Sequence, residues 1–242
     1  MIFYTGLHKP WQAKHFAHAF ISANRMRTRR VPLGCPDWIM DSGAFTELQT
    51  HGRYRQGVEA YAELVNRIAA FDPGLTAVVA QDFMCESLIL DRTGLTIGEH
   101  QRLTIDRYDQ LLALSRVQII PVLQGFRVEH YLQHLEIYGD RLAPGAYVGV
   151  GTLCKRNGAP YQVEAILTAI KIRRPDLRLH GFGLKTTSLR SDLVQRCLHS
   201  ADSMAWSYAA RREGRNRNDW REALAFSNMI EMMPVQQWMF PE

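Results

Sequence analysis

The sequence predicts an α/β fold, specifically a TIM-like (β/α)8 barrel. Short apolar runs recur along the chain, and each ends in a polar side chain or a glycine. Buried parallel strands end in this way where they deliver residues to a site. The runs are WIMDSGAF (38–45), AVVAQD (77–82), IIPVLQG (119–125), YVGVG (147–151) and LHGFG (179–183). Helical patterns separate them, and this alternation is typical of a parallel sheet with crossover helices.

The pattern predicts the elements in order. The clear strands are residues 2–5, 38–41, 76–81, 118–123, 147–151, 177–182 and 203–207. The predicted helices cover residues 11–26, 58–71, 97–114, 128–138, 161–173, 188–199 and 218–232. Thr96 and Glu99 form a capping box before the third of these helices, and residues 83–96 and 152–158 read as loops. A complete barrel needs one more strand, which is irregular or lies within residues 27–37.

An open, doubly wound sheet is the alternative fold. That fold is expected to carry a Gly-x-Gly-x-x-Gly turn after its first strand, and Gly149-x-Gly151 is only a fragment of the motif. The chain shows no internal repeat, low-complexity tract or linker. We therefore expect one barrel domain over residues 1–242.

Composition is that of an ordinary globular protein, with 46% hydrophobic and 22% charged residues among 242. No apolar run approaches the length of roughly 20 residues that spans a bilayer, and no secretion signal is visible, so we expect a cytoplasmic protein. The four cysteines are isolated, which argues against a disulfide framework and against a compact zinc site.

The net charge of +5 is concentrated in two arginine clusters. The first cluster is Arg25, Arg27, Arg29 and Arg30, and the second is Arg211, Arg212, Arg215 and Arg217. Both could neutralise phosphates of a nucleic acid. The alternative is that they are solvated helix ends, where arginine is common.

On a barrel, the strand ends place a set of polar residues and glycines around one mouth. These are Asp41, Asp82, Gln124, Gly149, Gly151, Gly183 and Asp202. Carboxylates can divide nucleophilic and acid/base roles, and the amide of Gln124 suits the edge of a heterocycle. Nearby aromatic residues could stack on a base: Phe45, Phe83, Phe126 and Trp206.

Each of these residues has a structural alternative. Asp41 and Asp82 could cap helices, although no helical pattern follows either one at once. The glycines could be turn residues, and Phe45 and Phe126 could be packing residues. The nine histidines show no metal-ligand spacing with carboxylates.

Five motifs in order resemble the strand-end motifs of the tRNA-guanine transglycosylase superfamily. They are DSGAF (41–45), QDFMCE (81–86), PVLQG (121–125), GVG (149–151) and HGFGLK (180–185). The resemblance spans about residues 38–215. FYTGLHKP (3–10), ISANRMR (21–27) and DSMAWS (202–207) more closely resemble the DpdA branch, whose members place a 7-deazaguanine, typically preQ0, into DNA.

The resemblance implies base exchange. A guanine is flipped out of DNA, a carboxylate attacks C1′, and a free deazaguanine then displaces the enzyme with retention of configuration. By motif position, Asp82 and Gln124 read the purine edge with help from the backbone at Gly149–Gly151, and Asp41 transfers the proton. Further substrate-binding positions implied by the motifs are Ser42, Gly43, Phe45, Gly125, Gly183 and Lys185.

Three departures from the superfamily matter. The Cys-x-Cys-x-x-Cys zinc motif and the separate tRNA-binding domain are missing, so we expect no zinc, no other cofactor, and DNA as the partner beside the deazaguanine. The tRNA enzymes carry Asp-x-x-Asp, whereas here Asp202 is followed by Ala205 at the position of the nucleophile. We therefore expect Asp202 to be the nucleophile, with Asp41 as the rival.

The sequence alone is also compatible with other activities. The pocket could belong to a tRNA-guanine transglycosylase or to a hydrolytic N-glycosylase. The Ala205 departure also permits a non-catalytic subunit that binds nucleic acid. The sequence does not define the oligomeric state.

Overall fold

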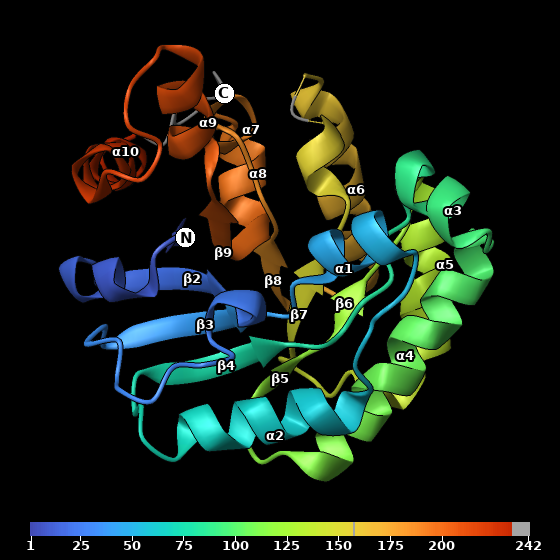
Figure 1. Cartoon of the computed structure of the whole chain (residues 1–242). Coiled ribbons are helices and arrows are strands. Elements are labelled where there is room, and N and C mark those ends of the chain that lie inside the picture. Colours follow the sequence, from blue (N-terminus) through green and yellow to red (C-terminus); the bar gives the residue numbers. More distant parts are fainter. Residues whose placement is uncertain (157, 234–242) are drawn as a thin grey trace, which may run out of the picture.

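A nearly closed, barrel-like sheet of parallel strands forms the centre of the computed structural model, which describes residues 1–156 and 158–233 (Figure 1). Its strands are β1 (Ile2–Gly6), β2 (His18–Ser22), β3 (Asp37–Asp41), β4 (Leu75–Val79), β5 (Ile119–Ile120), β6 (Val122–Leu123), β7 (Tyr147–Val150), β8 (Arg178–Gly181) and β9 (Leu198–Ser203). They follow the order β5-β4-β3-β2-β1-β9-β8-β7-β6.

The two ends of this sheet, β5 and β6, are consecutive pieces of one chain segment. Pro121 separates them, because proline has no N–H for the strand ladder. Its carbonyl still accepts the N–H of Gly149, at 2.8 Å. With β5 and β6 taken as one interrupted strand, the sheet confirms the predicted TIM-like architecture.

Helices connect most of the strands on the outside of the barrel (Figure 1). The α-helices are α1 (Ala44–His51), α2 (Val58–Ala69), α3 (Ser87–Thr93), α4 (Ile97–Leu114), α5 (Val128–Tyr138), α6 (Pro160–Arg173), α7 (Thr186–Leu189), α8 (Asp192–Cys197), α9 (Ala205–Arg212) and α10 (Trp220–Glu231). Short 3-10 turns are η1 (Pro10–His15), η2 (Ala23–Arg25), η3 (Gly139–Arg141) and η4 (Leu153–Arg156). The capping box of Thr96 and Glu99 is confirmed.

The strand missing from the sequence prediction is β2, and the predicted helix over residues 11–26 is wrong. The segment instead contains η1, β2 and η2. The centre of β2 is the apolar run Ala19-Phe20-Ile21, which is buried on both faces. A strand that is covered on both sides loses the alternation that distinguishes it from a helix.

Other predicted bounds were also wrong. The loop over residues 83–96 contains α3, and the helix over residues 188–199 is divided into α7 and α8. The last strand is β9 at Leu198–Ser203, and residues 205–207 begin α9. Helix α1 begins at Ala44 with Gly43 as its N-cap, so Asp41 does not cap this helix.

Helix α10 covers the part of the barrel where the β1–β2 connection has a 3-10 turn instead of an α-helix. The ring of Phe226 lies edge-on to Phe3 of β1, with centroids 5.9 Å apart. Trp220 stacks on His15 of η1 at 4.0 Å. The last described helix therefore completes the wall beside the first strand.

Two hydrophobic clusters stabilise the barrel. The larger one fills the layer between strands and helices, and Trp38, Tyr131 and Ile170 are among its fully buried members. The smaller one fills the interior of the barrel, with Tyr4, Phe20, Ile39, Val79, Ile120, Val122 and Tyr147. This interior cluster is the floor of the site described below.

No helix in the described part of the chain has the length and apolar character needed to cross a membrane. The prediction of a single domain over residues 1–242 includes residues 234–242, which lie outside the described part.

Candidate active site

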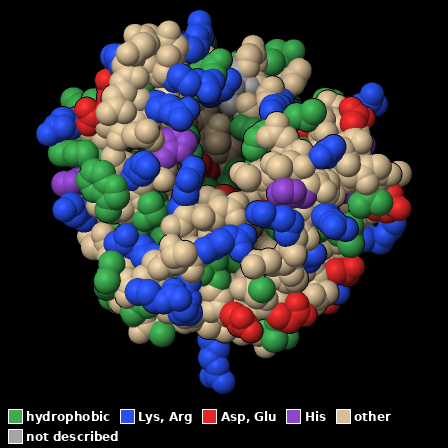
Figure 2. Space-filling view, in the orientation of Figure 1, with side chains coloured by type: hydrophobic (Ala, Val, Ile, Leu, Met, Phe, Trp, Pro, Cys, Tyr) green, Lys and Arg blue, Asp and Glu red, His purple; other side chains and the backbone are tan. Residues whose placement is uncertain are grey.

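The carboxyl ends of the strands surround a cavity of about 780 Å³, and Asp41, Gly43, Phe45, Gly183 and Asp202 are in its lining. Figure 2 shows a hollow in this face with lysine and arginine side chains around it. A smaller cavity of about 100 Å³ is lined by residues that include Asp82, Gln124 and Gly151. Asp41, Phe45 and Phe182 line both cavities, so the two adjoin.

The smaller cavity contains a hydrogen-bonded pair of a carboxylate and an amide. The Gln124 Nε2 donates to Oδ2 of Asp82, and the Ser42 hydroxyl donates to Oδ1 at 3.3 Å. The Oε1 of Gln124 accepts the Thr152 hydroxyl at 2.8 Å. Burial raises the pKa of Asp82 to about 6, although the bonds from Gln124 and Ser42 act in the opposite direction.

The backbone of Gln124 is fixed from behind by α4 and α5. Its N–H donates to Nδ1 of His134 at 2.8 Å, and its carbonyl accepts the Gln101 amide, also at 2.8 Å. Burial lowers the pKa of His134 to about 3, so the imidazole stays neutral and can act as this acceptor. The amide is therefore presented from a rigid backbone.

Glycines at the end of β7 provide space for these groups. A Cβ on Gly151 would lie 2.2 Å from Nε2 of Gln124, and a Cβ on Gly149 would lie 2.3 Å from the Phe182 ring. Their N–H groups donate within the sheet to the carbonyls of Leu123 and Pro121, respectively. These N–H groups are therefore not free to contact a base, and the contribution of the two glycines is steric.

Asp41 ends β3 and faces both cavities. Its Oδ2 accepts the N–H of Gly43 at 3.0 Å. Gly43 has φ of 79°, and a Cβ there would lie 2.5 Å from Nδ2 of Asn24, so glycine is required. Burial, and then the charges of Asp82 and Asp202, raise the pKa of Asp41 to about 7. This carboxyl can hold or release a proton near neutral pH.

Asp202 lies in β9, and its carboxylate has donors on one oxygen. The Oδ1 accepts the N–H of Gly183 at 3.0 Å and lies 3.3 Å from Nε2 of His180. The other imidazole nitrogen is 2.8 Å from the Ser200 hydroxyl, which also bonds Tyr147 at 2.5 Å. A buried chain of polar groups thus orients Asp202 from inside the barrel.

Sequence reasoning missed His180 as a member of the site. Its imidazole is fully buried between the rings of Phe20 and Phe182, with centroids at 5.4 and 4.7 Å. The available signal was its place two residues before Phe182 in HGFG, where a strand side chain alternates toward the barrel interior.

Although Ala205 stands at the position where the tRNA enzymes carry their nucleophile, a carboxylate, that of Asp202, still lines the cavity. Asp202 pairs with Tyr4 of β1, and β9 ends one residue later, at Ser203. Ala205 is the first residue of α9 and is not part of the strand. Asp202 lines the larger cavity together with Asp41, so both candidate nucleophiles face the same space.

The structure does not bring every predicted residue to the cavities. Gly125 packs against the start of α5, and Lys185 is exposed before α7. Among the aromatic candidates, Phe45 lines both cavities. Phe83 is buried and lines neither cavity, and Trp206 is buried and donates its indole N–H to the Gly6 carbonyl. Phe126 lines a separate pocket.

The first arginine cluster divides into two parts. Arg25 and Arg27 line the larger cavity. Arg29 donates to the carbonyls of Val31 and Pro32, at 2.8 and 2.7 Å, and Arg30 donates to the carbonyl of Arg29. The latter two arginines therefore support their own loop and do not line the cavity.

The arginines of the second cluster also differ in their contacts. Arg211 and Arg212 lie over the exposed ring of Tyr208, and Arg215 pairs with Glu213 and Glu222. Burial, then the charges of Arg25 and Arg217, lower the pKa of His8, which lines the larger cavity. The two clusters therefore approach each other at His8.

No group of three or more His, Cys, Asp or Glu side chains in residues 1–156 and 158–233 is arranged to hold a metal ion. The prediction that no zinc or other cofactor is needed stays a prediction.

Comparison with known proteins gives a family match. A family model described as "DpdA: DeoxyPurine in DNA protein A" matches residues 1–219. No curated protein matches the chain.

Proposed function

The chain belongs to the DpdA family, which is involved in 7-deazapurine modification of DNA, and we propose that it exchanges guanine in DNA for a free 7-deazaguanine, preQ0 or a derivative. The observation that carries this proposal is the pairing of two different carboxylates, Asp41 and Asp202, around one cavity beside the Asp82–Gln124 pair. Such a site has the parts that a double displacement at a sugar carbon needs.

The Asp82–Gln124 pair suits the hydrogen-bonding edge of guanine. The purine presents a carbonyl oxygen as acceptor and its ring N–H and amino group as donors. Asp82 accepts from the two donors, and Gln124 has a second Nε2 hydrogen for the carbonyl. A 7-deazaguanine keeps this edge and differs elsewhere on the ring. One pocket therefore holds the departing base first and the incoming base afterwards.

Asp202 and Asp41 have environments that suit different roles in the exchange. The N–H of Gly183 and the imidazole of His180 contact one oxygen of Asp202 and hold the carboxylate in a fixed orientation, which suits a nucleophile. The pKa of Asp41 near 7 suits a group that gives a proton and takes it back. The proposed assignment is Asp202 as nucleophile and Asp41 as acid and base.

The proposed steps balance in atoms and electrons. A carboxylate oxygen of Asp202 bonds to C1′, the bond from C1′ to N9 of guanine breaks, and the Asp41 carboxyl protonates the leaving purine. The deazaguanine N9–H then gives its proton to the Asp41 carboxylate, N9 bonds to C1′, and Asp202 leaves as a carboxylate. Two inversions retain the configuration of C1′.

Mass spectrometry of nucleosides tests the proposal, after incubation of the purified protein with preQ0 and either DNA or tRNA. We expect a deazaguanine nucleoside in DNA, and its absence in both the Asp202→Asn and Asp41→Asn variants. Asp91→Asn, an exposed substitution on α3, is the matched control and should retain activity.

Other outcomes would reject parts of this proposal. Modification of tRNA alone would identify a tRNA enzyme, and abasic sites formed without preQ0 would identify a hydrolase. If exchange required an added protein subunit, the chain would be a binding component. Full activity in Asp202→Asn would leave Asp41 as the nucleophile.

A further inference from the structure

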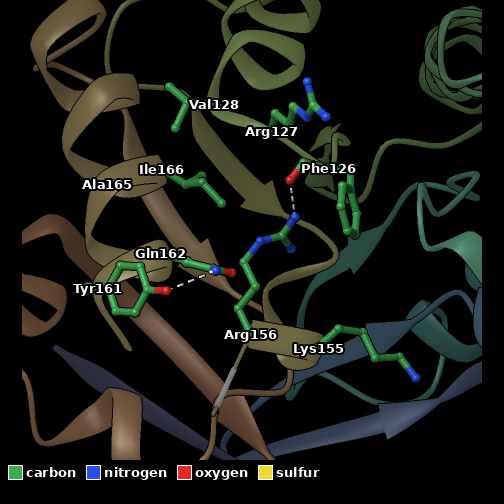
Figure 3. Close-up of a pocket in the computed structure, with 9 residues that line it drawn as sticks. All are labelled: Phe126, Arg127, Val128, Lys155, Arg156, Tyr161, Gln162, Ala165 and Ile166. Atoms are coloured by element: carbon green, nitrogen blue, oxygen red, sulfur yellow. Dashed lines mark hydrogen bonds between the residues drawn. The ribbon is translucent and has the colours of Figure 1, made fainter. Parts of the chain in front are cut away.

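A second pocket, of about 390 Å³, is separate from the two cavities described above, and Figure 3 shows the residues that line it. It lies between the segment after β6 and the start of α6. Its lining comprises Phe126, Arg127, Val128, Lys155, Arg156, Tyr161, Gln162, Ala165 and Ile166. None of these residues takes part in the proposed exchange.

The lining combines exposed aromatic rings with positive charge. Phe126 is 48% exposed and Tyr161 is 67% exposed. Figure 3 shows the Arg156 side chain lying between these two residues, with Arg127 on the same side of the pocket as Phe126. The described lining residues include three cations and no carboxylate. Such a surface is complementary to an aromatic ligand that carries negative charge.

Arg156 is fixed in place before any ligand arrives. It is buried, donates to the carbonyls of Thr152 and Phe126, and lies 4.9 Å from the centroid of the Phe126 ring. These two bonds leave further N–H groups of the guanidinium for an anion. Lys155 is less available, because its Nζ is 3.2 Å from Oε2 of the buried Glu86.

The pocket is linked to the base-binding pair through a short chain of hydrogen bonds. Arg156 donates to the carbonyl of Thr152, whose hydroxyl donates to Gln124. Phe126 follows Gln124 by two residues. The pocket therefore lies close to the amide that is proposed to hold the exchanged base.

We propose that this pocket binds the nucleotide next to the exchanged guanine. Its base packs against the rings of both Phe126 and Tyr161, and its phosphate contacts Arg127 and Arg156. Base stacking on aromatic side chains tolerates any sequence, and a phosphate gives salt-dependent affinity. This inference rests on the proposed action on DNA, and it adds a subsite that holds the strand while one base is out of the helix.

Binding of a fluorescein-labelled DNA duplex with a central mismatched guanine tests the subsite. The aromatic variants Phe126→Leu and Tyr161→Leu should each weaken binding about tenfold, as expected when one stacking contact is lost. The Arg127→Ala variant should lower the slope of log Kd against log salt by about one. Leu112→Ala and Arg116→Ala, exposed at the opposite end of the barrel, should change neither quantity.

A duplex that lacks the neighbouring base separates direct stacking from indirect effects. The two such duplexes carry an abasic residue on the 5′ or the 3′ side of the guanine. On one of them, Tyr161→Leu and the unaltered protein should bind equally. If the aromatic variants bind intact DNA as tightly as the unaltered protein, or if their defect persists on both abasic duplexes, the subsite is wrong and the pocket serves another ligand.

Exchange activity, measured in parallel, keeps this test separate from the proposed function. Normal exchange with unaltered binding in the variants rejects the subsite and leaves the function in place. The predicted binding defects without any exchange in the unaltered protein would support the subsite and reject the catalytic proposal.

Discussion

Replacement of Asp41 by asparagine should stabilise the folded protein above neutral pH while it abolishes base exchange. In the folded protein, burial and two neighbouring carboxylates raise the pKa of Asp41 from 3.8 to about 7. Unfolding removes both influences, so the unfolded chain releases this proton at lower pH. The contribution of Asp41 to stability is therefore fully present below about pH 3.8 and is lost as the pH rises to about 7.

The size of this effect follows from the shift. A difference of about three pK units, at ~1.4 kcal/mol for each unit, corresponds to about 4 kcal/mol. Asp41 is half-buried at a cavity mouth, where solvent screens its charge, and we therefore expect about half of this, ~2 kcal/mol. Asparagine keeps an acceptor for the N–H of Gly43 and never ionises. At this chain length, the gain at pH 8 should raise Tm by about 5 °C.

Urea and thermal unfolding of both proteins at pH 5 and pH 8 measure the prediction. The gain should be largest at pH 8 and less than half as large at pH 5, where part of the contribution of the wild-type carboxyl is still present. Asp91→Asn on the surface of α3 should change stability by less than about 0.5 kcal/mol at either pH. A gain that does not grow with pH, or a loss of stability at pH 8, would refute the reasoning about Asp41.

Three further changes test the rest of the site. Gly151→Ala places a Cβ 2.2 Å from Nε2 of Gln124 and should raise KM for the deazaguanine about tenfold without weakening DNA binding. Arg25→Ala should lower the salt slope of DNA binding by about one, whereas Arg215→Ala should not, because carboxylates already pair with Arg215. His180→Asn should slow formation of the glycosyl-enzyme at least about tenfold in single-turnover experiments and leave Kd for DNA unchanged.

Each of these changes has a control and a contrary outcome. Gly98→Ala, with its nearest atom at 3.9 Å in α4, should leave KM unchanged. Equal salt slopes for the Arg25 and Arg215 variants would show that cavity-lining arginines have no special part in binding. For His180, a merely structural role would lower Tm without changing the rate of the folded variant.

The sequence could predict the strand-end residues because their signal is local. Asp41, Asp82 and Gln124 each end an apolar run, and the carboxyl ends of parallel strands meet at one edge of the sheet. β2 could not be found in this way because His18–Ser22 lacks the alternation of a half-buried strand.

Relations across strands explain the remaining differences. His180 contacts Asp202 because β8 and β9 are neighbours with a shifted register, and no sequence spacing reveals that register. Arg215 belongs to a cluster of positive charge in the sequence, but folding places it against Glu213 and Glu222. The arginine clusters in the sequence therefore predicted a positively charged surface, but they overstated how many of its arginines are unpaired and able to contact phosphate.

The order of residues across the two cavities constrains where the proposed reaction occurs. Asp82 and Gln124 line the smaller cavity, while Asp202 and Arg25 line the larger one. A flipped nucleotide has its base, sugar and phosphate in the same order. In the proposed pose, the base of the flipped nucleotide lies against Gln124 and its phosphate lies toward Arg25. C1′ then lies at the junction of the two cavities. Asp41 lines both cavities at this junction, and Asp202 lines the larger one. The position of Asp41 at the junction of the two cavities, together with its raised pKa, supports the proposed assignment of Asp41 to proton transfer.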